Sequence, residues 1–383
     1  MYRPSARSIL LKNISNVPGW RTRRRLVVFE SDDWGSIRTP SREAFDHLQK
    51  DGVDLRSDAG HLYNLYDSMA TSEDLASLYE VLSSVRDGSG RPAVFTPVSV
   101  VANPDFERIR QSDYRNYFYE PFTETLKSHP GCGESFDRWK EGMEKRLFVP
   151  QFHGREHLNV AVWMRALQAG LPAPLSAFRN RMWGITTAGD PRIGVEFQAA
   201  FDFLDPEDLS THQEVLESGL KLFEQLFGYR AACFVPPNGR ISSSLEPLCA
   251  REGIRLLSVS RRHRAPLGNG KEERHYHWLG KQSRSGLTYT TRNCFFEPVE
   301  PGRDWVDSCL YEISAAFRWN KPALIGTHRV NYIGALYPEN RDRGLKSLGE
   351  LLKRIVNQWP GAEFVTSGEL GEIMNHGKSF EPA

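Results

Sequence analysis

Short apolar runs alternate with amphipathic segments along this 383-residue chain, and several of the runs end directly in polar side chains. The clearest is Val27–Phe29, which leads through Glu30 and Ser31 into the adjacent carboxylates Asp32 and Asp33. An apolar run of this composition predicts a buried strand. Strands that alternate with helices predict a parallel sheet, and polar residues at the strand ends favour a barrel whose functional groups gather at one mouth.

The same patterns predict the order of the elements along the chain. We expect strands at about 27–31, 93–101, 147–152, 231–235, 254–259, 287–291, 322–328 and 363–366. We expect helices at about 41–50, 72–82, 158–169, 209–227, 243–251, 304–317 and 344–359. The fold class that follows is α/β, with a TIM-like barrel of parallel strands.

Three stretches interrupt this rhythm. Residues of about 103–146 and 170–205 are expected to be insertions into a single domain that spans residues 1–383 and has its core at about 26–370. The aromatic residues of 113–122 could stack on sugar rings or form a small satellite core, and the sequence leaves both possibilities open. Residues 261–282, basic and rich in histidine, are expected to form a surface loop.

Composition limits the classes of binding partner and the cellular compartment that we expect for this chain. Lysine and arginine number 49 against 48 acidic residues, a net charge of +1. This balance predicts neither a nucleic-acid partner nor a membrane partner. The five cysteines are scattered without a CxxC pair, which argues against a disulfide framework and a thiolate zinc site. With neither a signal-peptide pattern nor an apolar run of about 20 residues, we expect a cytoplasmic protein, and its oligomeric state is left open.

Three polar sets follow three separate strands: Asp32 with Asp33, His153 with His157, and His328. Since all strand ends of a parallel barrel face one way, these sets are expected to meet at one mouth. The His-x-x-x-His spacing would place two imidazoles on one side of a helical turn, which suits a divalent metal. For each set alone there is a structural alternative, such as an Asp-Asp turn that caps a helix. Their occurrence together favours a metal site with an open position for substrate.

At these residues the chain resembles the NodB-type polysaccharide deacetylases, carbohydrate esterase family 4, and looks like a divergent branch of them. The resemblance implies a single NodB-like deacetylase domain, folded as a distorted (β/α) barrel of about seven parallel strands, that removes acetyl groups from glycans. It implies that Asp32 is the general base, that Asp33, His153 and His157 hold the metal, and that His328 is the general acid. Zinc is the default metal for such ligands, with cobalt and nickel as alternatives.

A further stretch, residues 234–239, resembles the family's proline-rich groove wall. The substrate contacts expected there and nearby are Phe234, Pro236, Pro237, Asn238, Trp34 and Arg240. The chain departs from the family at Val235, where an arginine that contacts the base is usual, and Arg230 or Arg240 could take that place. A second departure is the family's Asp-Trp motif, which has no counterpart after the strand at 254–259; Asp304 and Trp305 lie about one strand too late.

The function expected from the sequence is a metal-dependent hydrolase of carbohydrate metabolism, acting on C–N or ester bonds. It would remove an N-acetyl or O-acetyl group from a glycan precursor or a sugar-containing metabolite inside the cell. Two alternatives remain: a related glycoside hydrolase, which would need two carboxylates flanking the bond, and a glycan-binding protein without activity on a deacetylase scaffold.

Overall fold

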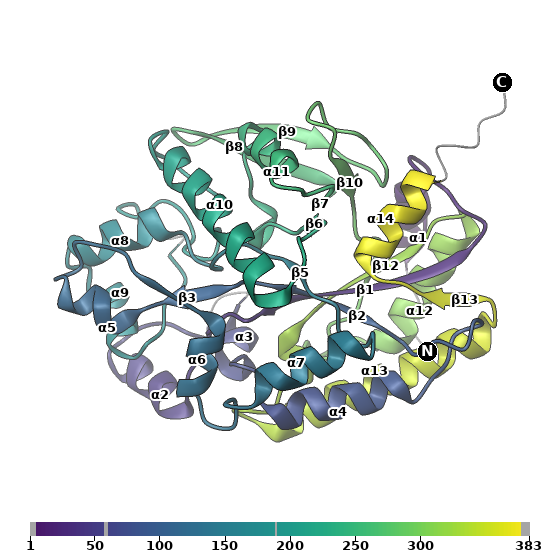
Figure 1. The fold of residues 1–383 in the computed structure, drawn as a ribbon, viewed down its shortest axis with the longest axis horizontal. Coiled ribbons are helices and arrows are strands. Elements are labelled where there is room, and N and C mark those ends of the chain that lie inside the picture. Colours follow the sequence, from purple (N-terminus) through teal and green to yellow (C-terminus); the bar gives the residue numbers. More distant parts are fainter. Residues whose placement is uncertain (1–4, 57–59, 188–189, 377–383) are drawn as a thin grey trace.

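A parallel sheet of nine strands forms the centre of the molecule (Figure 1). The computed structural model describes residues 5–56, 60–187 and 190–376, so the expected domain ends at 1 and 383 lie outside the described residues. The strands are β1 (Arg25–Trp34), β2 (Phe95–Ser99), β5 (Gln151–Phe152), β6 (Cys233–Phe234), β7 (Leu256–Ser258), β10 (Thr288–Thr290), β11 (Cys294–Phe295), β12 (Ala323–His328) and β13 (Ala362–Phe364).

Helices surround this sheet. They are α1 (Ala6–Ser15), α2 (Arg42–Lys50), α3 (His61–Tyr66), α4 (Ser72–Ser83), α5 (Phe106–Gln111), α6 (Phe122–Ser128), α7 (Ser135–Glu144), α8 (Val160–Gln168), α9 (Pro172–Arg179), α10 (Asp208–Phe227), α11 (Glu246–Arg251), α12 (Trp305–Arg318), α13 (Pro338–Gln358) and α14 (Ser367–His376). None of these helices has the length and apolar character that a membrane span needs.

The sheet is a barrel with an open seam. Its order is β10-β7-β6-β5-β2-β1-β12-β11, and β13 pairs with the first residues of β1. The outermost strands β10 and β11 are joined by residues 291–293 instead of pairing. The segment after α1 lies along this seam, where the Trp20 N–H donates to the Leu279 carbonyl and the Asn293 amide donates to Asn16 Oδ1. The prediction of a distorted parallel barrel is confirmed, with nine strands in place of about seven.

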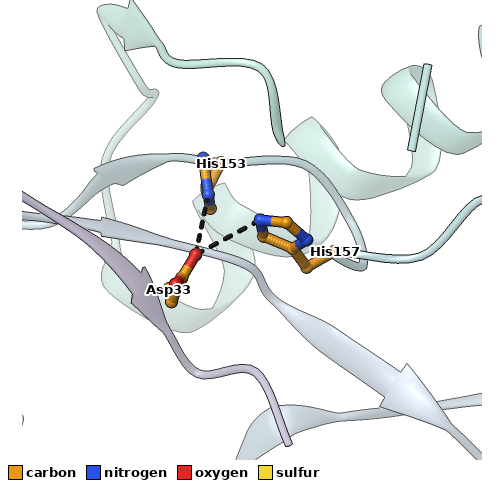
Figure 2. A group of neighbouring side chains, drawn as sticks. All are labelled: Asp33, His153 and His157. Atoms are coloured by element: carbon orange, nitrogen blue, oxygen red, sulfur yellow. Dashed lines mark ion pairs between the residues drawn. The ribbon is translucent and has the colours of Figure 1, made fainter. Parts of the chain in front are cut away.

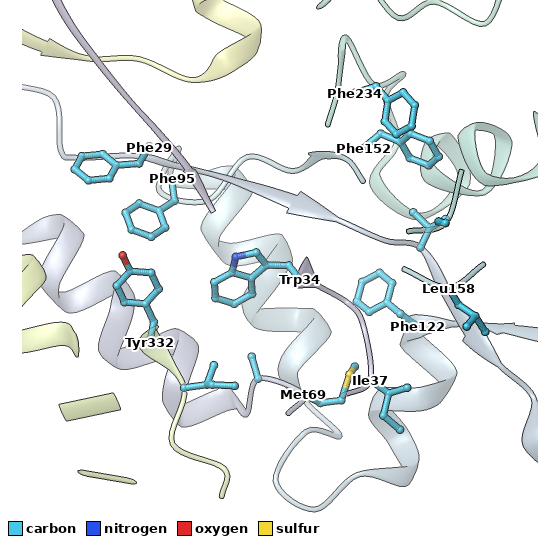
Figure 3. Close-up of a cluster of buried hydrophobic side chains, with 14 of the residues drawn as sticks. Phe29, Trp34, Ile37, Met69, Phe95, Phe122, Phe152, Leu158, Phe234 and Tyr332 are labelled. Carbon is cyan, nitrogen blue, oxygen red and sulfur yellow. The ribbon is translucent and has the colours of Figure 1, made fainter. Parts of the chain in front are cut away.

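The apolar runs form the core because helices cover the sheet. Residues 26–29 of β1 are completely buried, so both faces of the strand are apolar, as is usual for parallel sheets. Figure 3 shows the aromatic part of this core, where the Phe29 and Phe95 rings stack with centroids 5.2 Å apart. Tyr332 meets Phe95 edge to face at 5.3 Å.

Two of the three stretches that interrupt the rhythm contain regular elements. Residues 261–282 contain the antiparallel hairpin of β8 (Arg262–Gly268) and β9 (Lys271–Tyr276), so the prediction of a surface loop was wrong. Exposed and buried residues alternate over the first residues of β8, but the first buried position is His263, so the sequence lacks the usual apolar alternation there. The stretch 170–205 contains α9, which begins with Pro172 at its first helical position.

The stretch of 103–146 contains α5 to α7 and a short antiparallel pair, β3 (Ala102–Pro104) with β4 (Tyr119–Pro121). Two of its aromatic residues pack inward: Tyr114 meets Phe178 at 5.1 Å and Tyr117 meets Trp163 at 6.4 Å, both edge to face, whereas Tyr119 is exposed. This packing supports the satellite-core alternative over sugar stacking.

Candidate functional site

A cavity of about 720 Å³ lies at the carboxyl ends of the strands. It is lined by all five residues of the predicted polar sets: Asp32, Asp33, His153, His157 and His328. They come from the ends of β1, β5 and β12, three strands that are far apart in the sequence. The expectation that these sets share one mouth is therefore confirmed by the geometry.

An irregularity in β1 directs both aspartates into the cavity. In a regular strand, adjacent side chains point to opposite faces. The pairing of β1 with β2 shifts register between Ser31 and Trp34, and Asp33 has a φ of 72°, in the left-handed region that aspartate seldom adopts. This bulge brings Asp33 to the same side as Asp32, because the extra residue interrupts the alternation.

Asp33, His153 and His157 form the only group of three potential metal ligands found among the described residues, with ligand atoms within 4.8 Å of one another. Figure 2 shows both imidazoles turned toward the carboxylate. Asp33 Oδ1 lies 3.4 Å from His153 Nε2 and 3.2 Å from His157 Nε2. The two histidines follow β5 in a turn, not on a helix, because α8 begins only at Val160. Gly154, with a φ of 113°, allows this turn.

The protonation of these side chains suits a metal. His153 Nδ1 is 2.6 Å from the Val235 carbonyl, to which it donates, and this leaves Nε2 as a lone-pair donor facing Asp33. That Nε2 atom is buried and has no hydrogen-bond partner of its own. Burial lowers the pKa of His157 and so favours its neutral form. Although burial opposes ionisation of Asp33, the two histidines hold the pKa of that carboxyl well below its usual range. A carboxylate and two imidazoles match the ligands of catalytic zinc sites.

Asp32 is held by an arginine that the sequence analysis did not identify. Arg292 Nη1 and Nη2 donate to the two carboxylate oxygens of Asp32, each at 2.6 Å, and Arg292 Nε donates to Glu30 at 2.8 Å. Burial raises the pKa of Asp32, but Arg292 outweighs it, so that the pKa is lower than usual. Asp32 is therefore a buried, ionised carboxylate.

Neither arginine proposed from the sequence contacts Asp32. Arg240 pairs with Asp202 at 2.8 Å and with Glu272 at 2.7 Å, and Arg230 pairs with Glu224 at 3.2 Å. Arg292 follows β10, a strand that the sequence does predict. The rule of polar residues at strand ends could therefore have found it.

His328 is held between two acids. Its Nε2 lies 3.7 Å from Asp32 Oδ2, and its Nδ1 lies 2.6 Å from Glu297 Oε1. Burial lowers the pKa of His328, but Glu297 and, more weakly, the two aspartates of the cavity raise it, with a net rise to about 10. Asn331 fixes Glu297 by donating to its other oxygen at 2.6 Å. Glu297 escaped the sequence analysis because β11, the two-residue strand before it, is too short to recognise.

The predicted substrate contacts divide into two groups. Pro236 and Asn238 line the cavity, and Asn238 has a φ of 52° that turns the chain along its wall. Trp34 and Phe234 are buried in the core, and neither lines the cavity, so these predictions were wrong. The Trp34 ring packs against Trp139 and Phe148, and the Phe234 ring packs against Phe152 and Phe201.

Two further predicted contacts, Pro237 and Arg240, are not among the residues that line the cavity. Pro237 is buried, and the guanidinium of Arg240 is engaged by its acidic partners. In their place the structure brings Tyr63 into the lining, with its ring edge to face with His328 at 5.3 Å. Tyr63 lies on the short helix α3, which gave no clear signal in the sequence.

Comparisons with known proteins add distant structural likenesses. No family model and no curated protein matches the chain. Among solved structures, it is 10% identical to a protein from Parabacteroides distasonis assigned as a glycoside hydrolase/deacetylase, with a TM-score of 0.49 over 93% of this chain and 72% of that chain. It is 9% identical to a protein from Pseudomonas aeruginosa assigned as a polysaccharide deacetylase, with a TM-score of 0.47 over 94% of each chain. Likenesses this distant leave the chemistry to be argued from the side chains.

Proposed function

We propose that this chain is a metal-dependent hydrolase that removes an acyl group, in the first place an N-acetyl group, from a sugar. The observation that carries the proposal is the placement of Asp32 and His328. An ionised carboxylate and a histidine with a raised pKa lie 3.7 Å apart, beside three metal-type ligands and in one cavity. A proton acceptor and a proton donor at one site are what hydrolysis of an amide or ester requires.

The residues Asp33, His153 and His157 would hold the metal, and zinc, cobalt and nickel all accept this ligand set. A divalent metal at these residues supplies Lewis-acid polarisation of the acyl carbonyl. Asp32 is bound to Arg292 and is not one of these three ligands, so its carboxylate would act on the water that attacks.

Asp32 takes a proton from this water as the water oxygen forms a bond to the acyl carbon. The carboxylate is available for this step at neutral pH because Arg292 keeps it ionised. The two hydrogen bonds from Arg292 also fix the plane of the carboxylate, which orients the accepting oxygen.

His328 gives a proton to the leaving nitrogen as the C–N bond breaks. With a pKa raised to about 10, the imidazole is protonated at neutral pH and can act as the acid. Its Nδ1 is engaged by Glu297, so Nε2, which faces Asp32, is the nitrogen that donates. The products are a carboxylic acid and the free amine of the sugar. An O-acetyl group would give the alcohol by the same steps.

The geometry argues against glycoside hydrolysis. That reaction needs two carboxyl groups on opposite sides of the bond. Among the described residues that line the cavity, the only carboxylates are Asp32 and Asp33, which are neighbours in the chain. Asp33 belongs to the ligand group, so no second carboxylate flanks a bound sugar.

The test is release of acetate from a panel of N-acetylated and O-acetylated sugars by the purified protein supplied with zinc, cobalt or nickel. We expect Asp32→Asn and His328→Ala to abolish release while both variants keep bound metal. Asp137→Asn, an exposed aspartate on α7, is the matched control and should remain active. Glycan binding without acetate release by the wild type would instead support the binding-protein alternative.

A further inference from the structure

Helix α1 presents its apolar side chains to solvent. Leu10, Leu11 and Ile14 are 59%, 53% and 55% exposed, and Val17 just beyond the helix is 41% exposed. Their spacing of three to four residues puts them on one face, together with Arg7. No residue of α1 is buried.

The polar side chains of α1 face the protein instead. Lys12 pairs with Glu312 at 2.7 Å and donates to the Asn293 carbonyl at 2.8 Å. Asn13 Oδ1 accepts a hydrogen bond from the Trp319 indole at 2.8 Å. The helix is therefore inverted with respect to a surface helix of a soluble protein, in which the apolar stripe faces the core. An exposed apolar face of this kind indicates a binding surface.

The positive charges near α1 indicate what kind of partner this apolar face would bind. Residues 5–29 contain no acidic residue and six basic ones: Arg7, Lys12, Arg21, Arg23, Arg24 and Arg25. Lys12 and Arg24 are paired with Glu312 and Glu363, and Arg25 begins β1, so the argument rests on Arg7 and Arg21. Arg7 lies on the apolar face, and the Arg21 guanidinium reaches back to the Val17 carbonyl at 2.9 Å. Neither arginine forms an ion pair within the described part of the chain. An exposed apolar helical face flanked by arginines without ion pairs can lie in the plane of an anionic bilayer surface, where the arginines meet the phosphates.

We propose that α1 docks the protein on the surface of a membrane that contains anionic phospholipids, with Leu10, Leu11, Ile14 and Val17 among the lipids. The expectation of no membrane partner rested on the net charge of the whole chain. That number does not reveal a short segment that is locally basic. The docking surface borders the cavity, because Lys12 and Ser15 on the other side of α1 line it. Phe295, which also lines the cavity, is itself exposed beside Lys12. The cavity would thus open next to the lipid surface.

The inference does not depend on the proposed hydrolysis and is tested by binding alone. The full-length protein is mixed with phosphatidylcholine vesicles with or without phosphatidylglycerol, and the bound fraction is measured by flotation. We expect binding only to vesicles that contain phosphatidylglycerol, and weaker binding at high salt. Leu10→Gln with Ile14→Gln should weaken the partition by about tenfold or more. Arg7→Gln and Arg21→Gln should each weaken it by about fivefold.

Leu267→Gln is the matched control, since Leu267 is as exposed as these leucines but lies on the β8–β9 hairpin. It should leave binding unchanged. The proposal is overturned if the wild type does not bind anionic vesicles, or if it binds neutral vesicles equally well. It is also overturned if the Leu10 and Ile14 substitutions leave vesicle binding intact. A final contrary outcome is that the wild type forms a dimer and does not bind vesicles, and that the same substitutions dissociate the dimer. In that last case the partner of the face is a second copy of the chain.

Discussion

Arg292 grips both carboxylate oxygens of Asp32 from the three-residue connection that crosses the seam of the barrel. The Nε–H of the same guanidinium donates to Glu30, so one buried arginine contacts two buried acidic side chains. The pKa of Arg292 is raised, since both acids outweigh its burial. The open seam therefore has a function: because β10 and β11 do not pair, the residue between them can reach the end of β1.

Replacement of Arg292 by glutamine tests this ion network. The substitution removes the one cation that contacts both Asp32 and Glu30, so we expect the free energy of unfolding to fall by about 3–5 kcal/mol. Acetate release should also fall, while bound metal is unchanged, because Arg292 contacts none of the metal-type ligands. Urea unfolding measures the first effect, with Arg110→Gln, in an exposed ion pair with Glu107, as the control without effect. A variant as stable as the wild type would contradict the assigned network.

Glu297→Gln tests the tuning of His328. Because the folded-state pKa of His328 is raised to about 10, its proton is present at neutral pH and lost only as the pH rises through that value. Activity that needs this proton should therefore decline only in the alkaline range. Removal of the Glu297 charge lowers the pKa, and we expect the alkaline limb of the kcat/KM profile to move down by about 1–2 pH units. Glu350→Gln, on an exposed residue of α13, should leave the profile unchanged.

Substitution of the ligand histidines tests the metal site. We expect His153→Ala and His157→Ala to lose bound metal, as measured by elemental analysis after dialysis against a low concentration of zinc. Each variant removes one of three ligands, so the remaining two cannot hold the ion in competition with water. His47→Ala, an exposed histidine of α2, is the control that should keep it. If the wild type itself takes up no divalent metal, the proposed mechanism fails.

The sequence predicted the site correctly where potential metal ligands directly follow a recognisable strand. Asp33, His153 and His157 meet at one mouth as expected, because parallel strands end on the same side. The bulge at Asp33 and the turn at Gly154, which direct the side chains, are not visible in the sequence pattern. The pattern of apolar runs was equally reliable for long elements such as α10 and β12, where burial alone decides the structure.

Sequence reasoning failed where an element is short or where a polar residue is buried. The two-residue strand β11 hid Glu297, and the buried His263 hid the alternation of β8. The rule of polar residues at strand ends offers Arg292 as a candidate partner of Asp32, but it does not choose among Arg230, Arg240 and Arg292, which all lie near strand ends. In the structure the partner is Arg292, which lies between β10 and β11 and donates to both oxygens of Asp32.

Gly344→Ala tests whether the helix behind the site sets the position of its acid. Gly344 of α13 packs on Asn331 so closely that an added Cβ would lie 1.7 Å from the Asn331 carbonyl oxygen. Asn331 in turn holds Glu297 and donates to the His328 carbonyl at 3.0 Å. We expect a loss of about 1–3 kcal/mol of stability from the forced shift. The same shift should lower kcat with little change in KM, because it moves Glu297 and hence His328.

The matched control lies on the same helix. At Gly349 an added Cβ would meet only Val81 Cγ1, at 3.7 Å, which is an ordinary contact. Since alanine favours a helix more than glycine does, Gly349→Ala should leave activity unchanged and raise stability by up to about 1 kcal/mol. Thermal unfolding and steady-state kinetics on the two variants separate the effect on the helix from the effect on His328. Equal kcat values for Gly344→Ala and the wild type would show that Asn331 does not transmit its position to the acid.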